Sequence, residues 1–465
     1  MKKIKSSLLI LALISSQFIL ASDLSKPLQS RPFLGVSGSI EQPNSTNEYN
    51  GALIDRVIPG GTGDALTLKP NDLITSINTI KLRSFQHLID TLKNINVNDT
   101  LLLEVTRDDE KIQLTGKLKA RPKETVKSSS SYEIFYDSVN INNNRLRSIV
   151  YRPKLASTNK PFPALYFVQG YTCDSIDYGL IPELTSHQLL NAIAEAGYVV
   201  YKIEKFGIGD SIGDTQCSQI DFSSELAGFN AGLDALKSYD FVDKNQVHLF
   251  GHSLGGVYAP LIAQNSPLKS LISYGSVVKP WYDYLLDIYA KQALIFGTSS
   301  QQAKANSEVV KPLLNDWLKS NKKWSEVVAS PENKAALASN LIPIREDQVF
   351  QRHYTFFRDL NRYDFAQAWK QTSSHVLAIH GSLDIQAIDD KWATQMTTLP
   401  QKKGLITKKI VLNGTEHGFM KYDSMDEYLE ARNNRSYNPS QPGTHYDSRV
   451  SKTIIDWLNS FKEDH

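Results

Sequence analysis

The sequence has 465 residues, with 51 Lys and Arg against 49 Asp and Glu, and a formal net charge of +2 at pH 7. This near balance gives no reason to expect nucleic acid or an anionic membrane as a partner. The length suits two domains of roughly 90 and 330 residues, each large enough to bury its own core.

The first 22 residues have the pattern of a secretory signal peptide. Lysines are concentrated in residues 1–5, an apolar stretch follows at 8–20, and Ala21 and Ser22 are small residues typical of a cleavage site. Polar residues interrupt the stretch, which is too short to span a bilayer. We therefore expect an exported protein, periplasmic or secreted, without a stable membrane span.

Residues 31–120 contain the segments of a small α+β domain. The segment 32–36 is followed by a glycine-rich turn at 57–65 and by strand-like segments at 68–78 and 101–107. A helix is predicted from four apolar residues at positions i, i+3, i+4 and i+7, namely Phe85, Leu88, Ile89 and Leu92. Together these segments resemble a bacterial PDZ domain of the kind appended to exported serine proteases.

The PDZ resemblance implies a groove for a peptide C-terminus. In PDZ domains a peptide adds as a strand beside the helix, and loop amides hold its terminal carboxylate. On this sequence those amides would be Phe33, Leu34 and Gly35. A PDZ fold that only packs on the next domain, or regulates it, fits the same residues, and both interpretations stay open.

The remaining chain is predicted to be a linker followed by a large α/β domain. Residues 121–131 are charged and then serine-rich, without a hydrophobic period, as in linkers. From 132 to 465, apolar strand-like segments alternate with helical ones, which predicts a mostly parallel sheet covered on both faces. Within this domain the polar segment 422–446 is predicted to be a surface loop.

The segment 277–374 is predicted to be a helical cap insertion. It is far longer than ordinary connections between strands, and helical patterns recur in it, the last of them over 354–369. Such an insertion would cover the mouth of a site and select its substrate. Its aromatic residues either line a pocket or form the cap's own core, and they are Trp281, Tyr282, Tyr284, Tyr354, Phe356 and Phe357.

Residues 251–256 read Gly-His-Ser-Leu-Gly-Gly and follow the apolar run 247–250. A strand ending in Gly-x-Ser-x-Gly is the pattern of the nucleophile elbow, where serine occupies a strained turn and glycines prevent clashes. The turn would expose the Ser253 hydroxyl and aim the Leu254 N–H, at a helix N-terminus, toward a developing oxyanion. An ordinary glycine–serine turn is the alternative.

A serine nucleophile needs a histidine base and a carboxylate that orients the histidine. The strand-like segment 375–380 is followed by Asp384, and the segment 408–412 is followed by His417. The order Ser253, Asp384, His417 is the order of the α/β-hydrolase triad.

Other residues of the same types have weaker settings. Asp389 and Asp390 are alternative acids, but they are expected on the following helix and therefore in solvent. His445 lies in a polar loop and is the second candidate for the base. His252, inside the elbow, and His380, at a strand end, are expected to be structural.

A second oxyanion donor is usually a backbone N–H just after the third strand. The segment 164–168 is predicted to be that strand, and the amide of Tyr171 in the loop after it is the best candidate. Cys173 lies in the same loop, and Cys217 lies in the loop after the fourth strand. An exported protein with one pair of cysteines at the same sheet edge favours a disulfide between them, against two free thiols.

Residues 131–465 resemble the α/β-hydrolase superfamily, in particular its serine peptidase and acyl-esterase branches with Gly-His-Ser-x-Gly-Gly. One departure is Gln169-Gly170, where many members have His-Gly before the oxyanion donor. The resemblance implies an exported serine hydrolase that cleaves a small ester or a short peptide through an acyl-enzyme on Ser253. No His/Cys cluster has metal-ligand spacing, so we expect no metal or cofactor. The alternative is an inert binding protein whose PDZ domain captures C-terminal tails.

Overall fold

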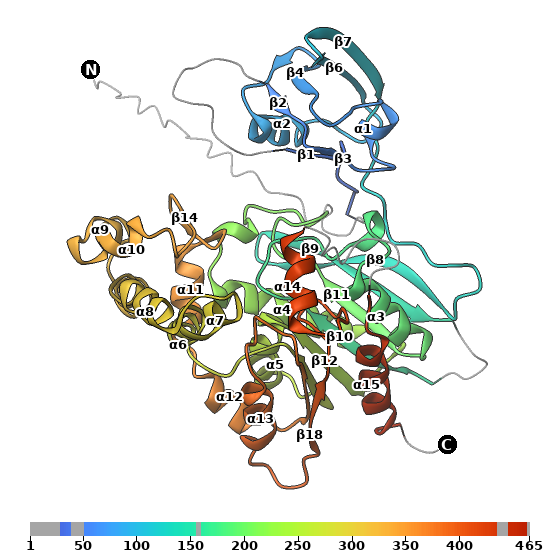
Figure 1. Cartoon of the computed structure of the whole chain (residues 1–465). Helices are drawn as coiled ribbons and strands as arrows, with labels where there is room; N and C mark the ends of the chain where they lie inside the picture. The colour runs from blue at the N-terminus through green and yellow to red at the C-terminus, as the bar shows by residue number, and fades with distance from the viewer. Residues whose placement is uncertain (1–27, 39–50, 155–159, 435–444, 463–465) are drawn as a thin grey trace, which may run out of the picture.

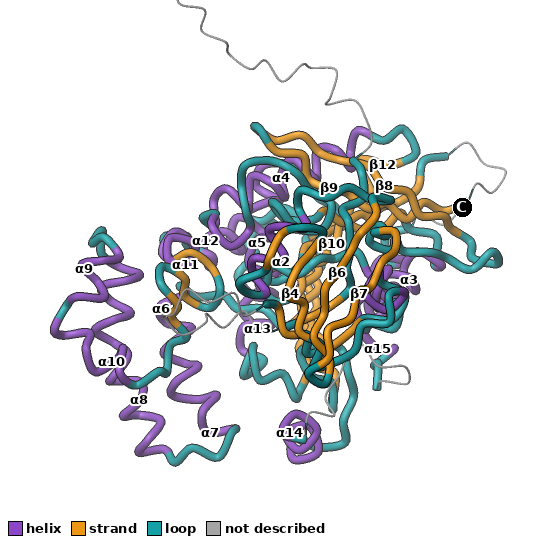
Figure 2. The backbone as a smooth tube through the Cα atoms, turned by 90° about the horizontal axis from the view of Figure 1, so that it is seen from above, coloured by secondary structure: helices purple, strands orange, loops and turns teal. Residues whose placement is uncertain are grey.

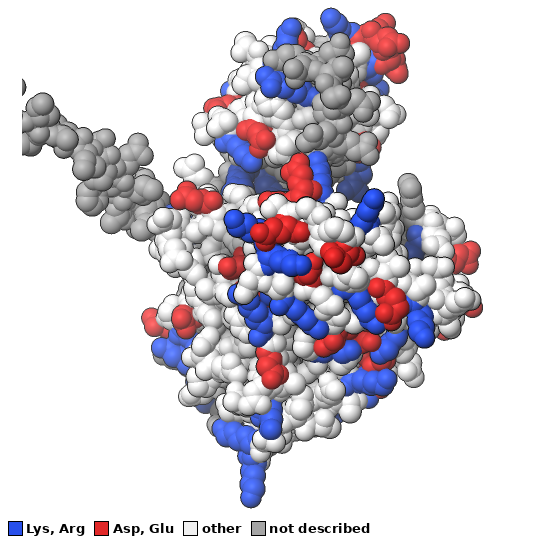
Figure 3. Space-filling view, turned by 90° about the vertical axis from the view of Figure 1, so that its left-hand side faces the viewer, with Lys and Arg blue, Asp and Glu red and all other residues white. Residues whose placement is uncertain are grey.

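The computed structural model describes residues 28–38, 51–154, 160–434 and 445–462, which form two domains (Figure 1). The predicted signal peptide at 1–22 lies outside the described residues. Within the described ranges, none of the helices combines the length and apolar character that a bilayer crossing requires. On the face shown in Figure 3, acidic and basic side chains are interspersed, in line with the balanced net charge.

The N-terminal domain is a small antiparallel sheet with one helix of two turns. Strands run in the order β2-β4-β6-β7 with β5 on β4, and β1 pairs separately with β3. The predicted helix is α2, which begins after Ser84, whose side chain accepts from the His87 N–H. The elements are β1 (Val36–Ser37), β2 (Ala52–Leu53), β3 (Arg56–Val57), α1 (Thr62–Ala65), β4 (Leu73–Ile77), β5 (Ile80–Lys81), α2 (Phe85–Leu92), β6 (Thr100–Arg107) and β7 (Glu110–Lys117).

The second domain is built on an eight-stranded sheet in the order β18-β17-β13-β12-β10-β11-β9-β8. Among these strands only β9 runs in the opposite direction, and the other seven run parallel to one another. This arrangement is the α/β-hydrolase fold, which confirms the predicted fold class. The strands are β8 (Tyr132–Ile141), β9 (Asn144–Pro153), β10 (Phe162–Val168), β11 (Val199–Ile203), β12 (Val242–His252), β13 (Ser270–Tyr274), β17 (His375–Gly381) and β18 (Thr407–Leu412).

Helices cover both faces of this sheet, as Figure 2 shows end-on. The central strands are mostly apolar because both of their faces are buried. One face packs on α3 (Thr185–Glu195) and α15 (Ser448–Asn459). The other packs on α4 (Phe222–Ser238), α5 (Leu254–Asn265), α12 (Phe365–Gln371) and α13 (Lys391–Thr398).

The insertion between β13 and β17 is a helical cap with a small sheet of its own. The predicted helix over 354–369 is wrong as a single element. It breaks at 361–364, where the Asp364 side chain accepts from the Gln367 N–H and starts α12. The cap elements are α6 (Trp281–Asp287), α7 (Ala293–Ile295), α8 (Ser300–Leu314), α9 (Trp324–Ala329), α10 (Lys334–Ala338), β14 (Ile344–Arg345), β15 (Gln348–Val349), β16 (Arg352–His353) and α11 (Tyr354–Leu360).

Two segments with polar composition are more ordered than predicted. The expected loop at 422–446 contains α14 (Met425–Asn433), which buries Tyr428 against the domain. In the expected linker at 121–131, Glu124 is buried and pairs with Lys202 of β11. The linker therefore lies against the hydrolase domain.

The residues just before the PDZ domain also contact the hydrolase domain. The backbone N–H of Arg31 donates to Asp210 at 2.7 Å, and the Arg31 guanidinium donates to the Gly207 carbonyl at 3.2 Å. Nearby, Arg147 of β9 pairs with Asp210 and donates to the Leu28 carbonyl. The glycine-rich loop at 207–213 is thus a docking point for the residues that precede the PDZ domain.

Candidate active site

Ser253 lies on the sharp turn between β12 and α5, with φ 56° and ψ −124°. This positive φ is unusual for a residue with a side chain and marks a strained turn. A Cβ on Gly255 would lie 2.0 Å from the Val168 carbonyl oxygen, and one on Gly251 would lie 2.3 Å from the Gly255 oxygen. Glycine is therefore required at both flanking positions, as the elbow pattern predicts.

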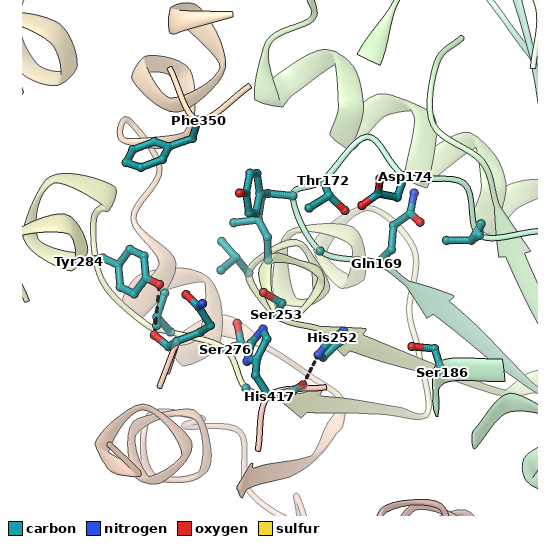
Figure 4. A pocket seen from close by; sticks show the side chains of 18 of the residues that line it. Gln169, Thr172, Asp174, Ser186, His252, Ser253, Ser276, Tyr284, Phe350 and His417 are labelled. Carbon is teal, nitrogen blue, oxygen red and sulfur yellow. Dashed lines mark hydrogen bonds between the residues drawn. The ribbon is translucent and has the colours of Figure 1, made fainter. Parts of the chain in front are cut away.

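The structure brings Asp384 and His417 together at the carboxyl edge of the sheet. The distance from His417 Nδ1 to Asp384 Oδ2 is 2.8 Å. Gly275, which follows β13, makes room for this pair, because a Cβ there would lie 2.6 Å from Asp384 Oδ2. Ser253 and His417 line the same cavity, and Figure 4 shows the serine side chain directly over the imidazole.

Asp384 is held as a buried anion. Its side chain accepts from His417, and its Oδ1 accepts from the amides of Gln386 and Ala387 at 2.8 and 2.9 Å. Burial opposes ionisation, but the His417 charge and these hydrogen bonds outweigh it and lower the pKa of Asp384. Burial likewise opposes protonation of His417, but the Asp384 charge and hydrogen bond raise the pKa of His417 above its ordinary 6.5.

His252 holds the backbone of His417 in place. Its Nε2 donates to the His417 carbonyl at 2.9 Å, the dashed line between these two residues in Figure 4. Burial, together with the nearby His417, lowers the pKa of His252 to about 3, so this imidazole stays neutral at neutral pH. A histidine inside the elbow thus fixes the backbone of the histidine at the site.

The other candidates make different contacts from this pair. Asp389 and Asp390 precede α13 instead of lying on it, and Asp390 pairs with Lys409. His445 bonds to the Lys421 carbonyl at 3.1 Å. His380 is buried at the end of β17, where burial lowers its pKa.

Both predicted oxyanion donors belong to residues that line the cavity. Leu254 is the first residue of α5, so its N–H has no carbonyl one turn earlier to bond. Tyr171 lies in the loop that follows β10. This loop is tied at Cys173 to Cys217 by a disulfide with a Cα–Cα distance of 5.8 Å, which confirms the predicted bond.

The cavity has a volume of about 490 Å³ and two unlike walls. The cap wall is apolar and includes Trp281, Tyr284, Leu285, Ile288, Phe350 and Phe357. Of the six cap aromatics considered from the sequence, three are therefore at the cavity. Tyr282 and Phe356 are buried in the hydrophobic core, and Tyr354 is partly buried against it. The opposite wall also carries polar side chains, namely Thr172, Asp174, Ser175 and Ser186, which no sequence pattern indicated.

The PDZ domain has a second cavity of about 640 Å³ beside α2. Its walls include the loop at 31–36, the apolar side of α2, and three residues of the hydrolase domain, Ile212, Gly213 and Gln216. Of the predicted carboxylate donors, Phe33 already donates its N–H to the Lys119 carbonyl at 2.9 Å. Among the described residues, nothing accepts from the amides of Leu34 and Gly35.

Comparison with known families identifies the first domain. Residues 32–118 match the family model described as PDZ domain, which confirms the predicted resemblance. The fold and the arrangement of its site residues thus define a chain with a PDZ domain followed by an α/β-hydrolase domain. A search of curated proteins finds no match.

Solved structures of esterases are similar to the chain at low identity. Est1E from Butyrivibrio proteoclasticus is 15% identical, with a TM-score of 0.42, over 70% of this chain and 98% of that one. Acetyl xylan esterase 1 from Thermoanaerobacterium sp. JW/SL YS485 is 16% identical, with a TM-score of 0.39, over 68% of this chain and 88% of that one. The esterase domain of a Rhodothermus marinus protein is 17% identical, with a TM-score of 0.37, over 65% and 98%.

Proposed function

We propose that this protein is an exported serine hydrolase that cleaves a small ester or a short peptide. The observation that carries the proposal is the Asp384–His417 pair at 2.8 Å, in the same cavity as the strained Ser253. A buried carboxylate fixed by two backbone amides has the geometry required of the orienting acid of a triad. Export is proposed from the pattern of residues 1–22 and agrees with the disulfide.

The proposed reaction is acyl transfer through a covalent intermediate. Ser253 Oγ attacks the substrate carbonyl while His417 Nε2 takes its proton, and Asp384 stabilises the imidazolium. The oxyanion accepts hydrogen bonds from the amides of Leu254 and Tyr171. His417 then protonates the leaving alcohol or amine, and water activated by His417 hydrolyses the acyl-enzyme.

The test of this function is labelling with a fluorophosphonate probe. We expect the wild-type protein to be labelled and Ser253→Ala to be unlabelled, because the probe bonds to an activated serine. Ser186 is a second serine of the cavity wall, so Ser186→Ala serves as the matched control and should label normally. No labelling of the wild type would favour the inert binding protein instead.

Substrate class is decided by turnover on the same preparations. Short-chain nitrophenyl esters and aminoacyl anilides report ester and peptide cleavage separately. Ester turnover without anilide turnover rules out the peptidase version, and activity on anilides supports it. In either case the activity must disappear in Ser253→Ala.

We further propose that the PDZ cavity binds a peptide carboxylate at the amides of Leu34 and Gly35. The apolar side of α2 suits an apolar last residue, and Arg31 and Lys93 lie at the same cavity.

In a fluorescence-anisotropy titration, we expect a labelled hexapeptide ending in a free Leu carboxylate to bind. The same peptide as a C-terminal amide should bind about tenfold more weakly, a loss of about 1.4 kcal/mol. Equal binding of the two peptides would contradict a carboxylate site.

A further inference from the structure

Three buried charged side chains lie behind the loop that carries Tyr171. Lys205 follows β11, Glu225 belongs to α4, and Arg352 belongs to β16 of the cap. Their exposed fractions are 2%, 1% and 1%. Glu225 joins the two cations, with 3.0 Å to Lys205 Nζ and 2.7 Å to the Arg352 guanidinium.

These cations bond to three consecutive carbonyl groups of the loop. Lys205 Nζ donates to the Gly170 carbonyl at 2.6 Å and to the Thr172 carbonyl at 3.0 Å. Arg352 donates to the Tyr171 carbonyl at 2.6 Å. With Glu225 as its third acceptor, the Lys205 ammonium uses all three of its N–H donors.

The direction of these carbonyls fixes the direction of the neighbouring amides. In a trans peptide unit the C=O and the next residue's N–H are coplanar and point in opposite directions. No peptide bond in the described residues is cis. Because the Gly170 carbonyl faces Lys205, the Tyr171 N–H points away from Lys205. Because the Tyr171 carbonyl faces Arg352, the Thr172 N–H points away from Arg352. Both Tyr171 and Thr172 line the active-site cavity.

We propose that Lys205 and Arg352, joined by Glu225, are positioning residues that aim the Tyr171 amide at the oxyanion. Neither side chain touches the reacting atoms, and each acts through a loop carbonyl. Arg352 also links this loop to the cap, so the cap that covers the substrate helps to hold the oxyanion donor. The inference rests on the proposed hydrolase function.

The test replaces each cation by a neutral residue of similar size. Glu225 keeps one cation in either Lys205→Gln or Arg352→Gln, so both single variants are expected to fold. We expect kcat for a nitrophenyl ester to fall about 10²-fold in Lys205→Gln and about tenfold in Arg352→Gln, with KM changed less than about threefold. Lys205 has the larger effect because it holds the peptide unit that contains the Tyr171 N–H.

A matched control is available six residues along the cap. Arg358 is also buried in the cap and also donates to a backbone carbonyl, that of Trp317, but it does not contact the loop. Arg358→Gln should lower the melting temperature as Arg352→Gln does and leave kcat unchanged. Equal losses of kcat in the two arginine variants would overturn the proposal.

Failure of the inference is distinct from failure of the proposed function. If the wild type neither labels at Ser253 nor turns over esters, the hydrolase proposal is wrong. If the wild type is active and both variants fold with wild-type kcat, only the positioning role is wrong.

Should Arg352→Gln fail to fold, Arg352→Lys keeps the charge and loses one of the two contacts. It should then give an intermediate kcat at unchanged KM, and wild-type kcat in this variant would contradict the role of Arg352.

Discussion

Replacing Asp384 by Asn is expected to lower kcat for ester hydrolysis about 10⁴-fold, by changing which nitrogen of His417 carries the proton. Asp384 Oδ1 accepts from two backbone amides, so this position must remain an oxygen in the variant. The new amide NH2 group then takes the place of Oδ2, 2.8 Å from His417 Nδ1, and donates to it. The imidazole proton moves to Nε2, which can no longer accept the proton of Ser253.

The same variant changes the pH dependence of kcat/KM. In the wild type, activity requires neutral His417 and should rise with pH around a midpoint above 6.5, because Asp384 raises the pKa of His417 against the effect of burial. The amide in Asp384→Asn has no charge, so burial dominates and the midpoint of the residual activity should move to lower pH.

Asp390→Asn is the matched control for the Asp384 substitution. Asp390 precedes α13 and pairs with Lys409, so its variant should keep both the rate and the pH midpoint. A pH–rate series on purified variants of equal melting temperature makes the comparison. Retention of more than about a tenth of wild-type kcat in Asp384→Asn would assign the orienting acid to another residue.

The features that were predictable from the sequence are those whose signal lies within one short segment. The elbow motif lies within five consecutive residues, although the backbone of the turn itself requires Gly251 and the carbonyl of Val168 in β10 requires Gly255. Asp384 and His417 each come shortly after a strand, and parallel strands end at one edge of the sheet. Their meeting therefore follows from strand order, without knowledge of any long-range contact.

The supporting network was not predictable for the opposite reason. Lys205, Glu225 and Arg352 come from three distant segments, and a charged residue is by default assigned to the surface. Their charges are compensated by one another and by loop carbonyls, and the Tyr258 hydroxyl also donates to Glu225. No period or motif in a single segment reports such an arrangement.

Composition also gave the wrong prediction for two polar segments that bury some of their side chains. The segment 422–446 is polar overall, but α14 packs Tyr428 at 1% exposure. The predicted linker is charged and serine-rich, but Glu124 within it is 5% exposed. Tyr422 and Tyr428 in the first segment, and Glu124 in the second, hold against the domain a backbone that its polar neighbours would leave in solvent.

Replacing Lys202 by Met is expected to lower the free energy of unfolding of the hydrolase domain by roughly 3–5 kcal/mol, because the Glu124 carboxylate would stay buried without its cation. Lys202 Nζ lies 2.5 Å from Glu124 Oε1, and both side chains are fully buried. Burial lowers the pKa of Lys202, although the charge of Glu124 opposes that effect. Glu124 also accepts from the Tyr151 hydroxyl and the Tyr178 N–H at 2.5 and 2.6 Å, which the variant keeps.

Urea unfolding followed by tryptophan fluorescence measures this loss in the right domain. All 6 tryptophans of the chain lie at position 281 or beyond, so the signal reports the hydrolase domain alone.

The double variant Lys202→Met/Glu124→Gln removes both charges and should recover most of the lost stability, since a buried ion pair is worth little net free energy over a neutral replacement. Lys452→Met, which removes an exposed pair with Asp456, should cost less than about 0.5 kcal/mol. If the double variant is as unstable as Lys202→Met, the loss comes from packing around residue 202, and the segment after the PDZ domain is not held by its charge.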